Sequence, residues 1–145
     1  MPSPKSLLSL PLFFSLFVAT AILFFGCAQP AQVSDEKEGA AYSQLSEIGA
    51  AYLQYRDSSR KPPESQENLI PILGDSHSYQ SVRDGTDLII LWGTEVPKDS
   101  GEPIVIGYES TSTNRSRLVL TSMGTMTMNE DEFRSAKFPA GHVPN

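Results

Sequence analysis

Apolar residues recur at helical spacing in the stretch from Ala41 to Tyr55. Successive members of this apolar stripe are four, three, four and three positions apart, which places them along one face of a helix. The members of the stripe are Ala41, Leu45, Ile48, Tyr52 and Tyr55. We therefore expect a helix that begins between Ser34 and Ala41 and ends near Asp57.

Two consecutive prolines, Pro62 and Pro63, end this helical pattern. Proline lacks the backbone N–H and disfavours the α conformation of the residue before it, so the chain cannot continue as the same helix. A shorter helical turn is expected next, with Ser65 as its N-cap. Its inner face would hold Leu69, Ile72 and Leu73.

The remaining chain alternates between short apolar runs and turn residues, a pattern that is typical of strands. We expect a strand within 87–92, DLIILW, and another within 103–109, PIVIGYE. Because side chains alternate between the two faces of a strand, the second strand should present Ile104, Ile106 and Tyr108 on one face. These strands would need the helix to cover them.

A hairpin and a capped helix are expected towards the end of the chain. Residues 117–121 and 125–128 flank a turn that contains a glycine, which favours a hairpin. Asn129 and Glu132 have the spacing of a capping box, and Phe133 would anchor the short helix that follows. The expected fold class is therefore α+β: an N-terminal helix packed on a small antiparallel sheet of three to four strands, with a short C-terminal helix.

The first residues have the features of an export signal rather than of a folded domain. Lys5 precedes an apolar run over 7–25, and a small residue stands just before Cys27. The stretch LFFGC resembles the lipobox of bacterial lipoproteins, which implies that Cys27 is diacylated and becomes the first mature residue. Two alternatives stay open. The run just reaches the membrane-spanning length of about 18 residues, so it could remain as an uncleaved anchor, or it could be cut as an ordinary secretory signal near Ala28.

These observations predict four segments along the chain. They are a lipoprotein signal peptide over 1–26, a flexible polar tether over 27–40, an α+β domain over 41–138 and a tail over 139–145, with residues 138–142 expected to pack loosely. The tether sequence AQPAQVSDEKEG is small, polar and charged, and twelve such residues reach about 20 Å. All three interpretations of the N-terminus place the domain outside the cytoplasm, in the cell envelope or beyond it.

The charge balance narrows the partners that the exported part would bind. The formal net charge of the chain is −6, and removing residues 1–26 removes Lys5 as the only charged residue there, which gives −7. An acidic domain without a cluster of lysine and arginine argues against nucleic acid and against anionic lipid headgroups. Contact with the membrane would then be through the N-terminal lipid. Cys27 is the only cysteine, so the domain has no disulfide and must be held by its core.

No catalytic motif stands out along the chain. There is no HExxH, GxSxG, P-loop or GxGxxG sequence. His77 and His142 both fall in expected loops, and neither has a cysteine or an acidic residue at ligand spacing. We therefore expect no enzyme activity, no metal and no cofactor. A Ser-His-Asp site assembled from distant residues stays open, since such triads form in space rather than in sequence.

Two aromatic residues and three methionines are the remaining candidates for binding. Trp92 and Tyr108 would line a ligand surface if the sheet face around them were open, although aromatic residues in short strands are more often part of the core. Met123, Met126 and Met128 lie on the expected hairpin. Copper binding through thioethers would require closer clustering with histidine, so these methionines indicate packing and an exposed hairpin tip.

Several short motifs, taken in order, resemble a known group of proteins. The motifs are IGAAYLQY, PP, ENLIPIL, RDG, WG and LVLTSMGTMTMNEDEF. Their order resembles exported planctomycete-type bacterial lipoproteins with a pseudopilin-like periplasmic domain, which is related to type II secretion pilins. The resemblance covers about residues 43–138 and implies a pilin-like fold. The chain differs from this pattern by having Met123 before Gly124 where an Asp-Gly turn is common, and by lacking a glutamate in its N-terminal apolar segment.

Three roles are consistent with these observations. The first is a lipid-anchored envelope protein whose pseudopilin-like domain is a structural or protein-interaction module, with other envelope proteins as partners. The second is a binding module for a small molecule or an extracellular polymer, through the sheet face near Trp92 and Tyr108. The third is a hydrolase with a dispersed site. An exposed edge strand would favour the first role, because sheet edges recruit partners by strand addition.

Overall fold

The computed structural model describes residues 31–97, 101–112 and 116–144. The chain divides into two units, 1–33 and 34–145, and the packed part of the fold belongs to the second. The elements are, in order, α1 (Ala31–Ser59), η1 (Gln66–Asn68), α2 (Ile70–Leu73), β1 (Leu88–Ile90), β2 (Val105–Glu109), β3 (Ser116–Thr121), β4 (Gly124–Asn129) and α3 (Glu130–Ser135).

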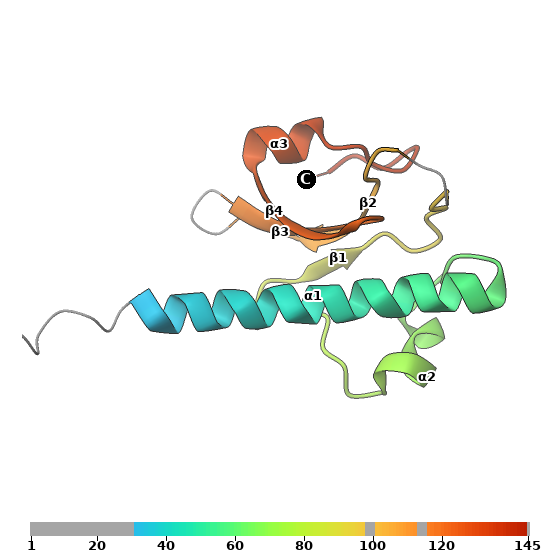
Figure 1. The fold of residues 1–145 in the computed structure, drawn as a ribbon, viewed down its shortest axis with the longest axis horizontal. Coiled ribbons are helices and arrows are strands. Elements are labelled where there is room, and N and C mark those ends of the chain that lie inside the picture. Colours follow the sequence, from blue (N-terminus) through green and yellow to red (C-terminus); the bar gives the residue numbers. More distant parts are fainter. Residues whose placement is uncertain (1–30, 98–100, 113–115, 145) are drawn as a thin grey trace, which may run out of the picture. The chain divides into compact units, whose positions relative to one another are not determined.

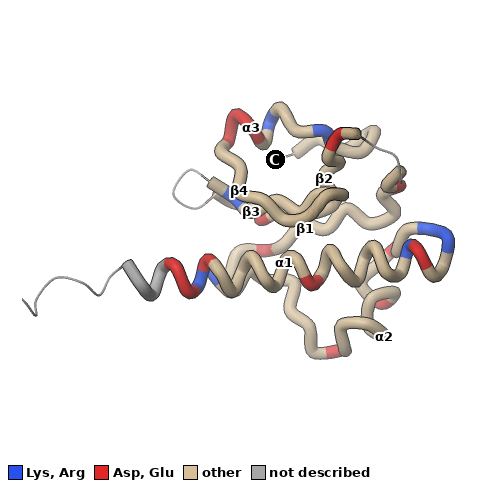
Figure 2. Tube along the Cα trace, viewed as in Figure 1, with Lys and Arg blue, Asp and Glu red and all other residues tan. Residues whose placement is uncertain are grey.

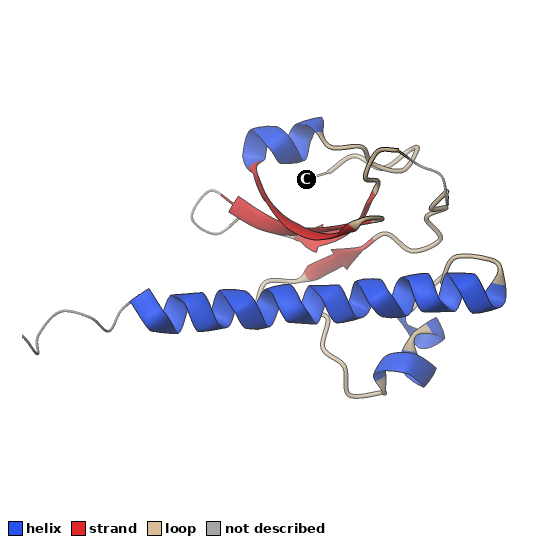
Figure 3. Ribbon diagram, in the orientation of Figure 1, coloured by secondary structure: helices blue, strands red, loops and turns tan. Residues whose placement is uncertain are grey.

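The four strands form one antiparallel sheet in the order β1-β2-β3-β4, so that each strand pairs with its neighbour in sequence (Figure 1). Across the sheet, Ile89 is opposite Tyr108, Tyr108 is opposite Val119, and Val119 is opposite Met126. Figure 3 shows α1 on one side of the sheet and α3 on the other. The expected α+β class, with a helix on a small antiparallel sheet and a short C-terminal helix, is confirmed.

The apolar stripe of α1 packs against the sheet. Leu45, Ile48 and Tyr52 are fully buried, as the helical spacing predicts. They form the first core together with apolar residues from β1, β2 and β3. The members of this core on the strands are Leu88, Ile90, Ile106, Leu118 and Leu120. Burial of such side chains contributes about 1.5–3 kcal/mol each, so this core holds helix and sheet together.

The segment between α1 and β1 packs against the same core. Ser65 is the N-cap of η1 as expected, and the side chain of Asn68 accepts hydrogen bonds from the backbone N–H groups of Glu64 and Ser65. Leu69 is fully buried in the first core, and the partly buried residues Ile72 and Leu73 pack on it. The expected inner face of this turn is therefore confirmed.

The expected flexible tether is largely helical. Within its range of 27–40, α1 already begins at Ala31, while residues 27–30 lie outside the described part of the chain. Residues 35–40 are all exposed, so tertiary packing does not explain why they are helical. Glutamate, lysine and alanine favour helices, and a helix nucleated on the buried stripe extends by one hydrogen bond per residue. Residues 34–40 form a helical extension about 10 Å long.

The prediction that Ile106 and Tyr108 share one face is wrong. The pairing of β2 with β3 shifts between Val105 and Gly107, which marks a β-bulge. A bulge inserts one extra residue and reverses the alternation beyond it. Ile106 therefore packs in the first core, whereas Tyr108 packs in the second core on the other face of the sheet.

The second core lies between the sheet and α3. Its buried members are Val105, Tyr108, Val119 and Phe133. As predicted, Asn129 caps α3 by accepting hydrogen bonds from the N–H groups of Asp131 and Glu132, and the Glu132 carboxylate accepts from the N–H of Asn129. This capping box fixes the start of the helix, and Phe133 is its buried anchor.

The expectation that residues 138–142 pack loosely is wrong. The backbone N–H of Val105 donates to the carbonyl of Lys137 at 2.9 Å, which ties the chain to β2 just before this segment. The ring of Phe138 then packs edge-on against Phe133, with 5.2 Å between their centres. His142 follows at 3.1 Å from the hydroxyl of Tyr108. Because part of the second core is covered by this segment, the tail beginning at residue 139 is not separate from the domain.

Candidate functional site

Trp92 and Tyr108, the two aromatic candidates, do not lie on a common surface. Trp92 is half-buried beside the first core, where its ring lies 6.4 Å from that of Tyr52 and 6.0 Å from that of Tyr79. Tyr108 is 2% exposed in the second core. The two cores lie on opposite faces of the sheet, so the sheet face proposed for ligand binding is not formed.

The rings around Trp92 belong to a continuous aromatic cluster. Tyr79 contacts Trp92 on one side and His77 on the other, with 5.7 Å between the last two rings. Burial raises the pKa of Tyr52 and of Tyr79 above the usual value for a phenol, and the charge of Glu67 adds to the effect on Tyr79. The cluster packs the connection after α2 against the first core.

The two histidines have different surroundings in the fold. His77 is half-buried, and its Nε2 atom is buried with no hydrogen-bond partner among the described residues. His142 contacts Tyr108 and Phe138 at the second core. Neither is the fully exposed loop residue that its sequence position indicates. Within the described residues, no group of three or more histidine, cysteine, aspartate or glutamate side chains is arranged to hold a metal ion.

The lipidation candidate, Cys27, lies outside the described residues. None of the helices in the described part of the chain has the length and hydropathy needed to cross a membrane. The apolar run over 7–25 precedes the described part, so the choice between a cleaved signal and an anchor stays a prediction.

Glu109 carries a buried charge, and its burial is not predicted by the sequence. It is fully buried at the end of β2, where its carboxylate forms an ion pair with Arg83 and accepts a hydrogen bond from the Ser81 hydroxyl at 2.8 Å. It also accepts one from the backbone N–H of Leu118 at 2.9 Å. A glutamate after an apolar strand does not indicate burial, because its partners are distant in sequence.

A second buried arginine lies beside this pair. Arg117 on β3 donates to the backbone carbonyl of Glu109 at 3.3 Å and to the carboxylate of Glu130 at 2.8 Å. Its guanidinium lies 4.0 Å from the centre of the Phe133 ring, a cation–π contact. The hydrogen bond from Arg117 holds the pKa of the Glu130 carboxyl below its usual value. These charged groups form an internal network that links β2, β3, α3 and the turn at Arg83.

The network and α1 together immobilise the turn around residues 78–83. The Gln44 amide on α1 donates to the backbone carbonyls of Ser78 and Gln80, and its oxygen accepts from the N–H of Val82. Glu109 holds the same segment from the sheet. Nε of Arg83 is buried without a hydrogen-bond partner among the described residues, but the ion pair and the hydrogen bonds of Gln44 and Glu109 hold this turn in one conformation, so these residues are best explained as structural.

The outer edge of β4 is engaged by contacts at both of its ends. The backbone N–H of Leu118 points towards β2, where it donates to the Glu109 carboxylate. In an antiparallel pair, a residue opposite one that points away from it also points its own backbone groups away. Thr127 and Thr125, which pair with Leu118 and Leu120, therefore direct their backbone groups away from β3. Tyr42 on α1 donates to the carbonyl of Thr125 at 2.7 Å. At the other end of the strand, the N–H of Asn129 is bonded within the capping box. These two contacts restrict strand addition at this edge to the middle of the strand, around Thr127.

A groove between α1 and the turn of the β3–β4 hairpin offers more surface than this edge. It consists of two adjoining hollows of about 330 and 270 Å³. We call it the hairpin groove. Leu53 on α1 and the turn residues Ser122 and Met123 line both hollows. Ala50 and Leu120 add to one hollow, while Val96 and Pro97 add to the other.

The walls of the hairpin groove are held by contacts on both sides. Ser46 on α1 donates to the Thr125 hydroxyl at 2.9 Å. Arg56 donates to the carbonyl of Val96 at 3.2 Å and forms an ion pair with Asp57 at 2.8 Å. Because these opposite charges lie next to each other, the lining carries no net charge.

Charge is distributed unevenly elsewhere on the chain. Figure 2 shows acidic residues at the start of α1 and at the start of α3, and basic residues at the far end of α1. The acidic groups of α3 are Glu130, Asp131 and Glu132. Arg60 and Lys61, just beyond α1, are the exposed basic residues at the other end. The acidic groups of α3 lie in its first turn, where negative charge favours the helix end, and need no ligand to explain them.

Comparisons with protein families, curated proteins and solved structures found no match to this chain. Its function therefore has to be argued from its own residues and geometry.

Proposed function

We propose that this protein is an exported, lipid-anchored component of the cell envelope, attached through Cys27. Its α+β domain serves as a structural or protein-interaction module of pseudopilin-like type, with other envelope proteins as partners. The observation that carries the proposal is α1, which begins four residues after Cys27 and is continuous to Ser59. Within the domain, the exposed turns at residues 35–40 are therefore the part that follows the anchoring segment in the sequence.

The two parts of α1 have different surroundings, and this supports the proposed role. Residues 35–40 are exposed on all sides, whereas the stripe from Ala41 to Tyr52 is buried against the sheet. A helix that is polar all round is a spacer rather than a packing element. The exposed turns would hold the domain away from a lipid surface as a rigid spacer.

The surroundings of the charged residues favour a protein-interaction role over a catalytic role. Arg83, Arg117 and Glu109 are turned inwards and satisfy one another or the backbone. The hairpin groove, in contrast, exposes apolar atoms around Met123, which is 58% exposed. Exposed apolar surface with a polar rim is typical of sites that bind other proteins.

Labelling with a fatty-acid analogue tests the anchor. Cells producing the full chain should incorporate the label, and Cys27→Ser should abolish it while the chain is still exported. Ser46→Ala, which leaves the N-terminus unchanged, serves as the matched control and should be labelled like the wild type. Equal labelling of Cys27→Ser and wild type would contradict the lipid anchor.

Deletion within α1 tests the spacer and the interaction role together. Removing residues 32–38 takes out seven residues, close to two helical turns at 3.6 residues per turn, so the phase of the helix is nearly kept. The domain should fold but be cross-linked to fewer envelope proteins in intact cells. Replacing the same residues by seven that favour helix should restore the cross-links. Unchanged cross-linking after the deletion would show that the spacer has no such role.

A further inference from the structure

We propose that the exposed end of α1 is an extensible spacer, in which residues 35–40 exchange between helix and open chain while the rest of the packed helix stays folded. We call residues 35–40 the spacer segment. This role rests on the proposed lipid anchor and deepens it, because it states how far the anchored domain reaches. One helix has two kinds of surroundings: the spacer segment is exposed throughout, whereas the next residue, Ala41, is 2% exposed.

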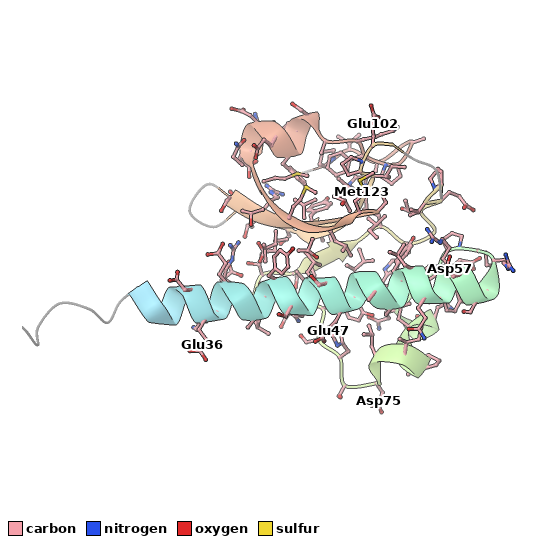
Figure 4. The ribbon with its side chains drawn as sticks, in the orientation of Figure 1. Glu36, Glu47, Asp57, Asp75, Glu102 and Met123 are labelled. Carbon is pink, nitrogen blue, oxygen red and sulfur yellow. The ribbon has the colours of Figure 1, made fainter. Side chains whose placement is uncertain are left out.

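Tertiary contacts do not hold the spacer segment in its helical form. All of its residues are exposed, and Figure 4 shows Glu36 with its side chain directed away from the sheet. A Cβ atom added at Gly39 would have no atom within 4 Å outside its chain neighbours and the adjoining helix backbone. Opening the spacer segment therefore breaks backbone hydrogen bonds of the helix without exposing any core side chain.

Side-chain pairs along the helix do not replace the missing tertiary contacts. Opposite charges three or four positions apart stabilise a helix, and like charges at the same spacing destabilise it. Lys37 is the only basic residue of the spacer segment, and neither an aspartate nor a glutamate lies three or four positions from it. Asp35 and Glu38, in contrast, lie three positions apart and carry the same charge. The helical form of the spacer segment is therefore only marginally favoured over the open chain.

Gly39 places a weak point of the helix directly before the packed part. Relative to alanine, glycine lowers the helix–coil equilibrium constant about five-fold. The glycine at position 49 has a packing reason, since an added Cβ atom there would lie 2.4 Å from Leu120. Gly39 has no such neighbour, so its effect is on the stability of the helix itself. It lies two residues before Ala41, where the buried stripe begins.

The packed part of α1 limits the opening to the spacer segment. The Tyr42 hydroxyl donates to the backbone carbonyl of Thr125 at 2.7 Å, and Leu45 and Ile48 are fully buried in the first core. Unwinding beyond Ala41 would break this hydrogen bond and expose core side chains, which requires opening of the domain itself. The open stretch therefore has a fixed end at the start of the buried stripe.

Opening changes how far the anchored domain reaches. The six residues of the spacer segment span about 9 Å as a helix and at most about 21 Å as an extended chain. In the helical form this segment is a rigid spacer of fixed length. In the open form it lengthens by at most about 12 Å and lets the domain turn, so one anchored domain meets partners at different distances from the membrane without losing its fold.

Hydrogen exchange of the full chain in detergent, read by mass spectrometry and corrected for intrinsic rates, tests the proposal. Amides of the spacer segment should exchange at least about 100-fold faster than those of residues 45–52, which open only with the core. Gly39→Ala should slow exchange in the spacer segment about two- to five-fold and leave residues 45–52 unchanged. Gly101→Ala is the matched control, because a Cβ atom added there also has nothing within 4 Å but lies outside α1.

Pulsed electron spin resonance measures the lengthening directly. In a Cys27→Ser background, spin labels at Glu36→Cys and Gln54→Cys lie about 27 Å apart along a continuous helix. The full chain should give this distance together with a broad, longer component, and Gly39→Ala should reduce the longer component. Labels at Ser43→Cys and Ser58→Cys, both within the packed part, should give one narrow distance with or without Gly39→Ala.

Three outcomes would overturn the proposal. They are a spacer segment whose amides are protected as strongly as those of residues 45–52, a Gly39→Ala variant that exchanges like the wild type, and a Gly101→Ala variant that slows exchange in the spacer segment as much as Gly39→Ala does. Fatty-acid labelling of Cys27 is read separately. If Cys27 is labelled while the spacer segment is strongly protected, the anchor stands and the extensible spacer fails; if exchange is fast while Cys27 is unlabelled, the opening stands and the anchor fails.

Discussion

Gly49 and Leu120 define the closest approach of α1 to the sheet. A Cβ atom built on Gly49 would lie 2.4 Å from Cδ1 of Leu120, nearer than real contacts allow. Glycine normally destabilises a helix by about 1 kcal/mol relative to alanine. Because glycine has no side chain, the helix backbone packs closely against β3 at this position. This contact forms the base of the hairpin groove.

We predict that Gly49→Ala destabilises the domain despite its better helix propensity. The overlap with Leu120 should cost about 1–3 kcal/mol, against a gain of about 1 kcal/mol from propensity. The net loss should be about 1 kcal/mol, measured by urea unfolding. In a Leu120→Val background the clashing Cδ atom is absent, so Gly49→Ala should become neutral or stabilising. The same loss in both backgrounds would show that the contact is not the cause.

Breaking the buried ion pair should be more damaging than removing both of its charges. Glu109→Gln would leave Arg83 buried without a counter-charge, which should cost about 3–5 kcal/mol. The double variant Arg83→Met with Glu109→Gln removes both charges and keeps an amide oxygen that can accept a hydrogen bond from the N–H of Leu118, so its unfolding midpoint in urea should lie above that of Glu109→Gln alone. A double variant less stable than Glu109→Gln would contradict this account. Asp75→Asn, at an exposed loop residue, is the control and should change little.

Stability should depend on the ionisation of Glu130. Arg117 lowers the pKa of this carboxyl in the folded chain, so the unfolded chain binds the proton more tightly than the folded one does. The stabilisation is fully present above the ordinary value of 4.5 and is lost as the pH falls through the lowered pKa. The advantage of wild type over Glu130→Gln in urea should therefore be largest near neutral pH and shrink towards pH 3. A difference independent of pH would rule out this linkage.

The C-terminal segment should contribute to stability. Phe138 packs with Phe133 and Tyr108, but it is only partly buried, so Phe138→Ala should cost about 2 kcal/mol, less than the value for a fully buried ring. Val143→Ala is the matched control, since Val143 is 81% exposed and should shift the midpoint very little. Equal, near-zero shifts for both variants would restore the expectation of a loosely packed tail.

Features that depend on neighbouring residues were predictable from the sequence. The buried stripe of α1 follows from 3.6-residue periodicity, and the capping box of Asn129 and Glu132 needs only residues three apart. The hairpin follows from two apolar runs around Gly124, whose φ of 128° favours glycine. In each case the physical cause is local, so one stretch of sequence contains all of it.

The candidate site was not predictable in the same way. Trp92 and Tyr108 were grouped because both follow apolar runs, but the bulge between Val105 and Gly107 turned Tyr108 to the other face. Met123 was expected at an exposed hairpin tip. The hollows beside it depend on how far α1 lies from β3, and that distance is decided by Gly49 and Leu120.

The sequence by itself determined the helix stripe, the antiparallel hairpin and the helix cap, because those depend on spacing along the chain. Tertiary structure alone decided that Glu109 is buried with Arg83, that Phe138 covers the second core, and that a groove opens beside Met123. The physical reason is separation in sequence. Ser81 and Arg83 are far from Glu109 in the sequence, and Tyr108 is far from Phe138, so the residues around Glu109 and Phe138 in the sequence do not show that these contacts will form.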